Sequence, residues 1–147
     1  MKRSTGLRNY MLASGSFMDA MAGKVIKIYT GSVPVSADAA LAVGNTLLCT
    51  MTVDGDGVTG LTLAHTAAGG QITKNTSEVW EGEIVASDTA TFFRHETMAD
   101  AGALSTDAIR LQGTVSNIGA DLNFTDKEFV LGDTRRINYY VAAIPAG

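Results

Sequence analysis

The chain has 147 residues and a formal net charge of −4, with 46% hydrophobic and 18% charged residues. This composition excludes a disordered chain, and the length is typical of one domain with a sizeable core. The negative balance argues against non-specific binding of nucleic acid by the body of the protein.

The first 31 residues differ in charge from the rest of the chain. They hold five basic side chains against Asp19 alone, whereas residues 32–147 hold six basic and fourteen acidic ones. A basic segment on an acidic body is typical of an arm that binds a partner surface. We therefore expect an N-terminal arm, residues 1–23, followed by a β domain, residues 24–147.

The arm has the apolar spacing of two short helices. Leu7, Tyr10 and Met11 recur at i, i+3 and i+4, and Ser16 can cap a second helical turn. Helices this short are marginal alone in water, so they must dock on their own body, swap into a neighbour or bind another protein. The side chains expected to contact a partner are basic or apolar. They are Lys2, Arg3, Leu7, Arg8, Tyr10, Met11, Leu12, Phe17 and Met18.

From Lys24 onward the apolar pattern alternates with a period of two. Strands are predicted at 25–29, 46–53, 60–64, 71–74, 78–85, 89–96, 108–116, 128–131 and 135–144. We expect 78–85 and 89–96 to pair as a hairpin. Short strands at this spacing, without helices between them, favour a mainly β fold. The predicted class is an antiparallel β-sandwich, jelly-roll-like, preceded by the helical arm.

Alternation also predicts which side chains face the core. In the segment 108–116, Leu111 would face inward, and Arg110 and Gln112 would face solvent. In the last strand Tyr139 would point inward and Tyr140 outward. An exposed ring at Tyr140 would suit an interface with another molecule.

Each motif that could carry chemistry has a simpler interpretation. Residues 54–57 read Asp-Gly-Asp-Gly, but the later ligands of an EF-hand loop are missing, and Asp-Gly between strands is typical of a turn. His65 and His95 lack the spacing of a closed zinc site. Glu81 and Glu83 share one strand face, which favours a solvated surface over paired catalytic carboxylates. We therefore expect no enzymatic activity, no catalytic residue, no metal and no cofactor.

The single cysteine and the lengths of the apolar runs indicate in which compartment the protein is made. Cys49 has no partner for an intrachain disulfide and is expected to be a buried small hydrophobe. Arg8 and Asn9 interrupt any apolar run of a signal peptide, and no stretch approaches the ~20 apolar residues of a membrane span. The sequence therefore predicts a soluble protein made in the cytoplasm.

Six segments of the chain resemble small structural proteins of tailed bacteriophage virions. They are 4–9 (STGLRN), 25–31 (VIKIYTG), 79–82 (VWEG), 86–94 (ASDTATFFR), 112–115 (QGTV) and 119–123 (GADLN). Where related sequences often have tryptophan before the Phe-Arg pair, this chain has Phe92. The resemblance implies a β-sandwich present in many copies on the virion, without catalytic chemistry.

The role that the resemblance favours is a capsid decoration (cement) protein that binds and stabilises the assembled phage head. Its partners would be the major capsid protein or other virion proteins and further copies of itself, arranged as a homo-oligomer, expected to be a trimer. Neither nucleic acid nor membrane is an expected partner. Two alternatives remain: a neck or tail ring or fibre-attachment component, and a carbohydrate-binding or hydrolytic β-sandwich. An exposed aromatic platform or close carboxylates in a groove would support the latter.

Overall fold

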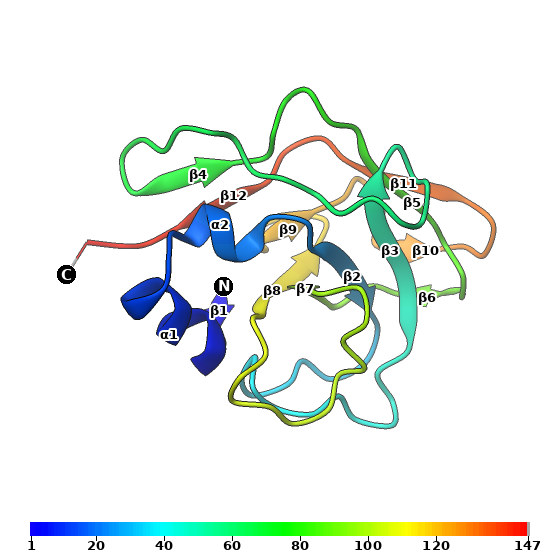
Figure 1. Ribbon diagram of the computed structural model, residues 1–147. Helices are drawn as coiled ribbons and strands as arrows, with labels where there is room; N and C mark the ends of the chain where they lie inside the picture. The colour runs from blue at the N-terminus through cyan, green and yellow to red at the C-terminus, as the bar shows by residue number, and fades with distance from the viewer. Residues whose placement is uncertain (147) are drawn as a thin grey trace.

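The computed structural model describes residues 1–146, and the described chain contains two short helices among many short strands (Figure 1). The helices are α1 (Thr5–Ala13) and α2 (Phe17–Met21). The strands are β1 (Lys2–Arg3), β2 (Val25–Tyr29), β3 (Leu47–Val53), β4 (Gln71–Thr73), β5 (Trp80–Glu83), β6 (Asp88–Thr89), β7 (Phe92–Glu96), β8 (Leu111–Ser116), β9 (Leu122–Asn123), β10 (Glu128–Phe129), β11 (Thr134–Ile137) and β12 (Val141–Ala143).

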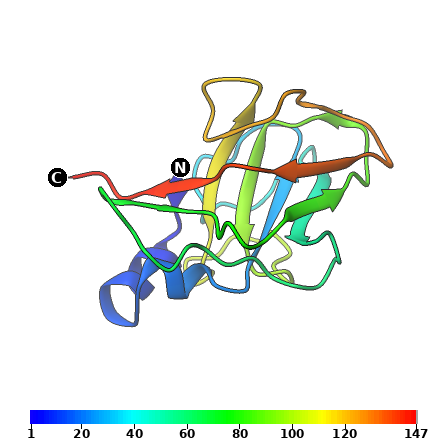
Figure 2. The same cartoon turned by 90° about the horizontal axis from the view of Figure 1, so that it is seen from above.

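One large sheet forms the body of the protein. Its strands lie in the order β1-β8-β7-β2-β3-β5-β11, and β9 pairs with β8. The neighbours along this path are antiparallel, and β8 and β9 are parallel. Two ribbons, β10–β6 and β4–β12, complete the fold, and Figure 2 shows the segment that leads from β11 to β12 crossing one face of the large sheet. The mainly β, antiparallel class predicted from the sequence is confirmed.

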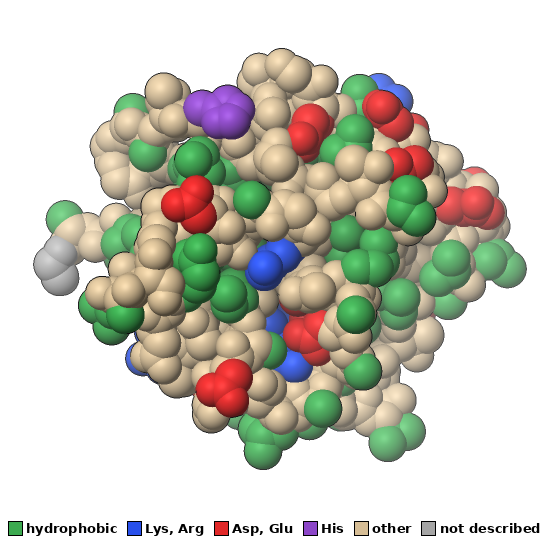
Figure 3. Space-filling model, in the orientation of Figure 1, with side chains coloured by type: hydrophobic (Ala, Val, Ile, Leu, Met, Phe, Trp, Pro, Cys, Tyr) green, Lys and Arg blue, Asp and Glu red, His purple; other side chains and the backbone are tan. Residues whose placement is uncertain are grey.

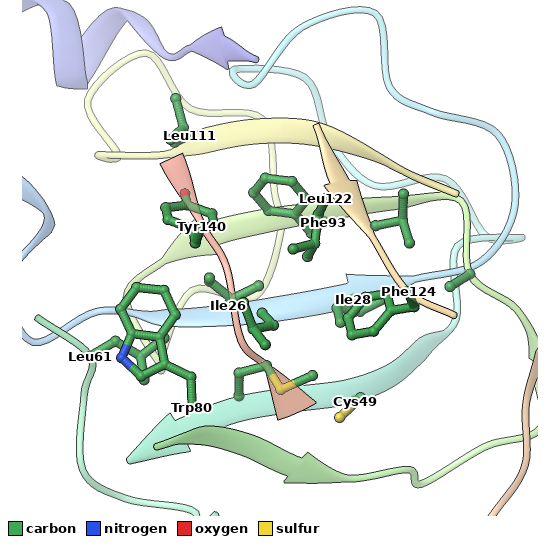
Figure 4. Packing of buried hydrophobic residues seen from close by; sticks show 14 of the residues in the cluster. Ile26, Ile28, Cys49, Leu61, Trp80, Phe93, Leu111, Leu122, Phe124 and Tyr140 are labelled. Carbon is green, nitrogen blue, oxygen red and sulfur yellow. The ribbon is translucent and has the colours of Figure 1, made fainter. Parts of the chain in front are cut away.

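The hydrophobic core lies on one face of the large sheet. Ile26 and Ile28 of β2, Phe93 of β7 and Leu111 of β8 point to the same side, as alternation along a strand requires (Figure 4). Residues outside these strands cover them from above, namely Leu61, Trp80, Leu122, Phe124 and Tyr140. All of these side chains are at most 7% exposed. Cys49 is buried in the same cluster, as expected.

The opposite face of the same strands is also buried, which the alternation did not predict. Arg110 is 2% exposed and Gln112 of β8 is 1% exposed, although both were expected to face solvent. Two long loops, residues 30–46 and 97–109, cover this face and accept hydrogen bonds from both side chains. The prediction failed because an isolated strand pattern carries no information about a distant loop.

Strand pairing differs from the sequence prediction in two places. β5 pairs with β3 and β11, and β7 pairs with β2 and β8, so the hairpin expected between 78–85 and 89–96 is absent. The expected strand at 135–144 is two strands, because the chain leaves the large sheet after Ile137 and pairs with β4 from Val141. The segment 60–64 makes only isolated bridges.

The N-terminal segment packs on its own chain. β1 pairs with β8, and Leu7 and Met21 are fully buried in the same cluster as Ile26. The approach is close, because a Cβ on Gly6 would lie 2.2 Å from the carbonyl oxygen of Asp107. Residues 1–23 therefore share the core of the β body. In this structure both helices dock on their own chain.

Candidate functional site

The predicted arm residues fall into three groups in the structure. Lys2, Arg8 and Leu12 are exposed, with Leu12 at 84%. Leu7 is completely buried and cannot contact a partner, so its prediction as a binding residue is wrong. The remaining five are half-buried: Arg3, Tyr10, Met11, Phe17 and Met18.

The three basic side chains of the segment all donate hydrogen bonds within the chain. Lys2 Nζ lies 2.9 Å from the carbonyl oxygen of Val35, and Arg3 Nη1 lies 3.3 Å from that of Ala143. Arg8 Nη2 lies 2.8 Å from Thr5 Oγ1. These contacts are exposed and individually weak. The bonds of Lys2 and Arg3 join the segment to the body, whereas that of Arg8 lies within α1.

Phe17 and Met18 line an apolar groove between α2 and the β4–β12 ribbon. A capping box starts α2, in which Ser16 Oγ accepts from the backbone N–H of Asp19 and the Asp19 carboxylate accepts from the N–H of Ser16. The groove has a volume of about 330 Å³. Figure 3 shows hydrophobic side chains over the helices and the ribbon, at the left of the view. Its lining consists of Ser16, Phe17, Met18, His65, Ala67, Gly70, Gln71, Ile72, Ala142, Ala143 and Ile144.

The chemistry of this groove suits apolar side chains. Phe17, Met18 and Ile72 rest against the core on one side and form the groove on the other. Ile144 at its rim is 46% exposed. Methionine adapts to irregular contact surfaces, and apolar area removed from water contributes about 25 cal/mol per Å². The groove therefore presents a hollow of mainly apolar surface on the outside of the molecule.

The prediction for the adjacent tyrosines is reversed in the structure. Tyr140 is 1% exposed and packs 5.4 Å from the Trp80 ring, while Tyr139 is 77% exposed. Tyr140 as an interface residue is therefore wrong. Strict alternation fails here because residues 138–140 connect the large sheet to the β4–β12 ribbon and belong to neither.

Tyr140 is anchored by a buried histidine. Its hydroxyl lies 3.1 Å from Nδ1 of His95, and burial raises the pKa of the Tyr140 phenol. Burial also lowers the pKa of His95 to about 3, with a smaller contribution from the charge of Lys24. His95 is thus neutral at pH 7, and its Nε2 makes no hydrogen bond to residues 1–146. The pair is a structural element of the core.

A second groove lies beside the exposed Tyr139. It has a volume of about 730 Å³, and a neighbouring groove of about 410 Å³ shares the segment 136–139 with it. The larger groove is lined mainly by polar side chains. Its lining consists of Ala120, Asp121, Asn123, Phe124, Thr125, Asp126, Arg135, Arg136, Ile137, Asn138, Tyr139 and Val141.

A charged cluster fills the second face of the large sheet. Lys27 Nζ lies 3.3 Å from Glu96 Oε1, and Arg110 Nε lies 2.6 Å from Asp100 Oδ2 and 3.7 Å from Glu96 Oε2. All four side chains are at most 10% exposed. Figure 3 shows basic and acidic side chains together in a hollow near the bottom of the view.

Burial and charge act in opposite directions on the two carboxylates of this cluster. Burial, with the nearby charge of Asp100, raises the pKa of Glu96. Burial alone would raise the pKa of Asp100 too, but hydrogen bonds from Arg110 and Gly102 lower it. Asp100 is therefore ionised at pH 7 and forms a charged pair with Arg110.

The cluster attaches both loops to the sheet. Arg94 of β7 donates to the carbonyl oxygens of Ser36 and Ala39, and Lys27 donates to that of Asp100. Because these donors bond to carbonyl oxygens of the loops, the cluster holds both loops on the sheet, and within residues 1–146 Glu96 Oε2 and Arg94 Nη1 make no hydrogen bond. The apolar pattern did not predict the cluster, although a lysine within the apolar run 25–29 was a usable signal.

The comparisons with known proteins add no assignment. Within residues 1–146, histidine, cysteine and carboxylate side chains do not gather in groups of three or more that could bind a metal. Within the same residues no helix has the length and apolar character to cross a membrane. No model of a protein family, no curated protein and no solved structure matches this chain.

Proposed function

We propose that the protein is a virion structural protein of a tailed phage, and specifically a capsid decoration protein that binds and stabilises the assembled head. The sequence resemblance supports the virion role. The observation that carries the proposal is the apolar groove between α2 and the β4–β12 ribbon. Its lining is mainly apolar, unlike that of the groove beside Tyr139, and it offers a docking site on the surface. As part of the proposal, the β body is a jelly-roll-like sandwich.

A decoration protein needs a rigid contact surface more than it needs chemistry. Here the surface is fixed in advance, because the capping box holds α2 and the pairing of β4 with β12 holds the opposite wall. A preformed surface reduces the ordering cost of binding. Many copies on one particle then gain from multivalency, and a cyclic trimer would present three grooves at once.

The groove predicts which substitutions will weaken decoration. Ile144→Asp and Met18→Gln should lower occupancy on heads purified without this protein, because each places a polar group where an apolar segment docks. Val58→Asp is the matched control, since Val58 is 78% exposed in the turn after β3. Circular dichroism should show that all three variants are folded. Deleting residues 1–22 is unsuitable, because it removes Leu7 and Met21 from the core.

Occupancy and heat resistance of the heads are the measurements. Wild type and Val58→Asp should saturate the heads and protect them from heat, and the two groove variants should do neither. If both groove variants decorate and protect as well as wild type, the proposal is wrong. Counting copies per particle tests the alternative, because a neck or tail component would be present in a single ring instead of over the whole head.

A further inference from the structure

We propose that the groove beside Tyr139 is a binding site for a neutral oligosaccharide. The site lies apart from the apolar groove at α2, with no lining residue in common, and does not depend on a role in the virion. It combines an exposed aromatic ring, open polar side chains and a surface long enough for several sugar units. The following observations carry the proposal.

Tyr139 presents an exposed aromatic ring from a backbone that is held in place. The residue two positions before it, Ile137, is 2% exposed, and the residue after it, Tyr140, is 1% exposed and bonded to His95. The backbone at Tyr139 is therefore held between two buried anchors, and its own ring remains 77% exposed. An exposed ring on a backbone that is held in this way offers its face for stacking. The apolar C–H face of a pyranose ring is a partner of matching size.

Polar groups open to solvent lie beside this ring. The side chains of Thr125 and Asn138 are exposed along the groove. Asp126 Oδ1 accepts from the backbone N–H of Glu128 at 2.9 Å, which holds that carboxylate in place, and the side chain is exposed. A hydroxyl, an amide and a carboxylate can donate to and accept from sugar hydroxyls. The ring thus fixes the position of a sugar and these groups can fix its orientation.

The charges of the groove select a neutral ligand. Arg135 stacks over Phe129 at 5.0 Å and donates to the carbonyl oxygen of Glu128. Arg136 forms an ion pair with Glu81 at 2.8 Å. The lining holds the carboxylates of Asp121 and Asp126 against these two arginines, and Asp121 is itself paired with the N-terminal amine at 3.1 Å, so the groove has no excess of positive charge to attract acidic sugars. The polar lining also contrasts with the apolar groove at α2, which suits a protein segment.

The dimensions fit a chain of sugars better than a single one. The neighbouring groove of about 410 Å³, lined by Thr73, Lys74 and Thr76 among others, shares the segment 136–139 with the groove beside Tyr139. Tyr139 therefore stands between two hollows of about 730 and 410 Å³. A ligand that stacks on the ring can extend along both, so hexasaccharides are the appropriate probes.

The test is NMR titration of the full chain with maltohexaose, cellohexaose, laminarihexaose and chitohexaose. At least one should shift the backbone amides of residues 123–126 and 136–139. Tyr139→Ala should raise its Kd by roughly tenfold, because the stacking surface is lost. Tyr139→Phe should bind within roughly threefold of wild type, because it keeps the ring. Leu104→Ala is the matched control for loss of a large exposed side chain, since Leu104 is 74% exposed on the distant loop 97–109.

Three outcomes would overturn the site. They are the absence of shifts in these segments with all four probes, equal binding by Tyr139→Ala and wild type, and stronger binding of polysialic acid than of every neutral probe. Failure here is separable from failure of the decoration proposal. Tyr139→Ala should decorate heads as wild type does, because Tyr139 is not part of the α2 groove.

Discussion

The two faces of the central strands are both buried, but by opposite means. Along β2, Ile28 faces a cluster of apolar side chains, while its neighbour Lys27 faces Glu96 and the carbonyls of a covering loop. The apolar face gains from area removed from water. The charged face gains only where every charge finds a partner, since an unpaired buried charge is strongly destabilising. The apolar face therefore loses little stability when a small amount of apolar surface is removed. The charged face loses more when one member of an ion pair is removed.

Removing one charge should be the most damaging change. Arg110→Met keeps an apolar stem but removes the guanidinium that pairs with the buried carboxylates of Asp100 and Glu96. We expect the free energy of unfolding to fall by about 3–5 kcal/mol in urea denaturation. Arg136→Met is the matched control, because its pair with Glu81 lies at the surface and should contribute about 1 kcal/mol or less. Equal effects of the two substitutions would refute the contrast between buried and exposed pairs.

Lowering the pH should change the free energy of unfolding in opposite directions through two adjacent residues of β7, His95 and Glu96. The folded pKa of His95 is depressed to about 3, so its contribution to stability is present above its unfolded pKa and is lost as the pH falls below about 6.5. Lowering the pH from 7 to 5 should cost about 2 kcal/mol through this group. The folded pKa of Glu96 is raised, so its contribution is present at low pH and is lost as the pH rises through the folded pKa.

Variants at the two positions separate these contributions. Stability curves of His95→Gln should lose the decline between pH 7 and 5, whereas Glu96→Gln should steepen the net decline toward acid. The reference is wild type measured by urea denaturation at each pH. An unchanged slope in His95→Gln would show that another group causes the acid sensitivity.

The smallest expected effect is a conservative change on the apolar face. Ile28→Val removes one buried methylene group beside Lys27 and should cost about 1 kcal/mol. Lys27→Met, at the next position on the other face, removes the partner of Glu96 and should cost more. Thermal unfolding of the two variants provides the comparison. A larger loss for Ile28→Val than for Lys27→Met would mean that the charged face contributes less than its geometry indicates.

Local patterns in the sequence were sufficient for single elements. The strand 25–29 and the helix start after Ser16 match the structure, because an apolar β-branched run and a capping residue act over a few positions. The pairing of the strands could not be predicted from local patterns in the same way. β5 joins β3 and β11 through contacts between segments far apart in the chain, which the turn at 86–88 does not specify.

The residues of the candidate sites could be predicted from the sequence only in part. Phe17 and Met18 were predicted as binding residues from their density in a short segment, but their groove is completed by Ile72 of β4 and by Ile144, which follows β12. Leu7 and Tyr140 were misplaced because burial depends on what covers a residue. Tyr139 was misplaced for the same reason, since the exit of the chain from β11 is a property of the whole sheet.

The anchoring of the N-terminal segment sets the order in which this chain can fold. Ser4 bonds to the backbone of Ala108 and Arg110, and β1 pairs with β8, across more than a hundred residues of sequence. During synthesis, Ser4 and β1 must remain without these partners until β8 has left the ribosome. Contacts so distant in sequence slow folding and leave apolar surface open to aggregation. Residues 2–4 thus reach their native positions only after the chain through β8 has been made.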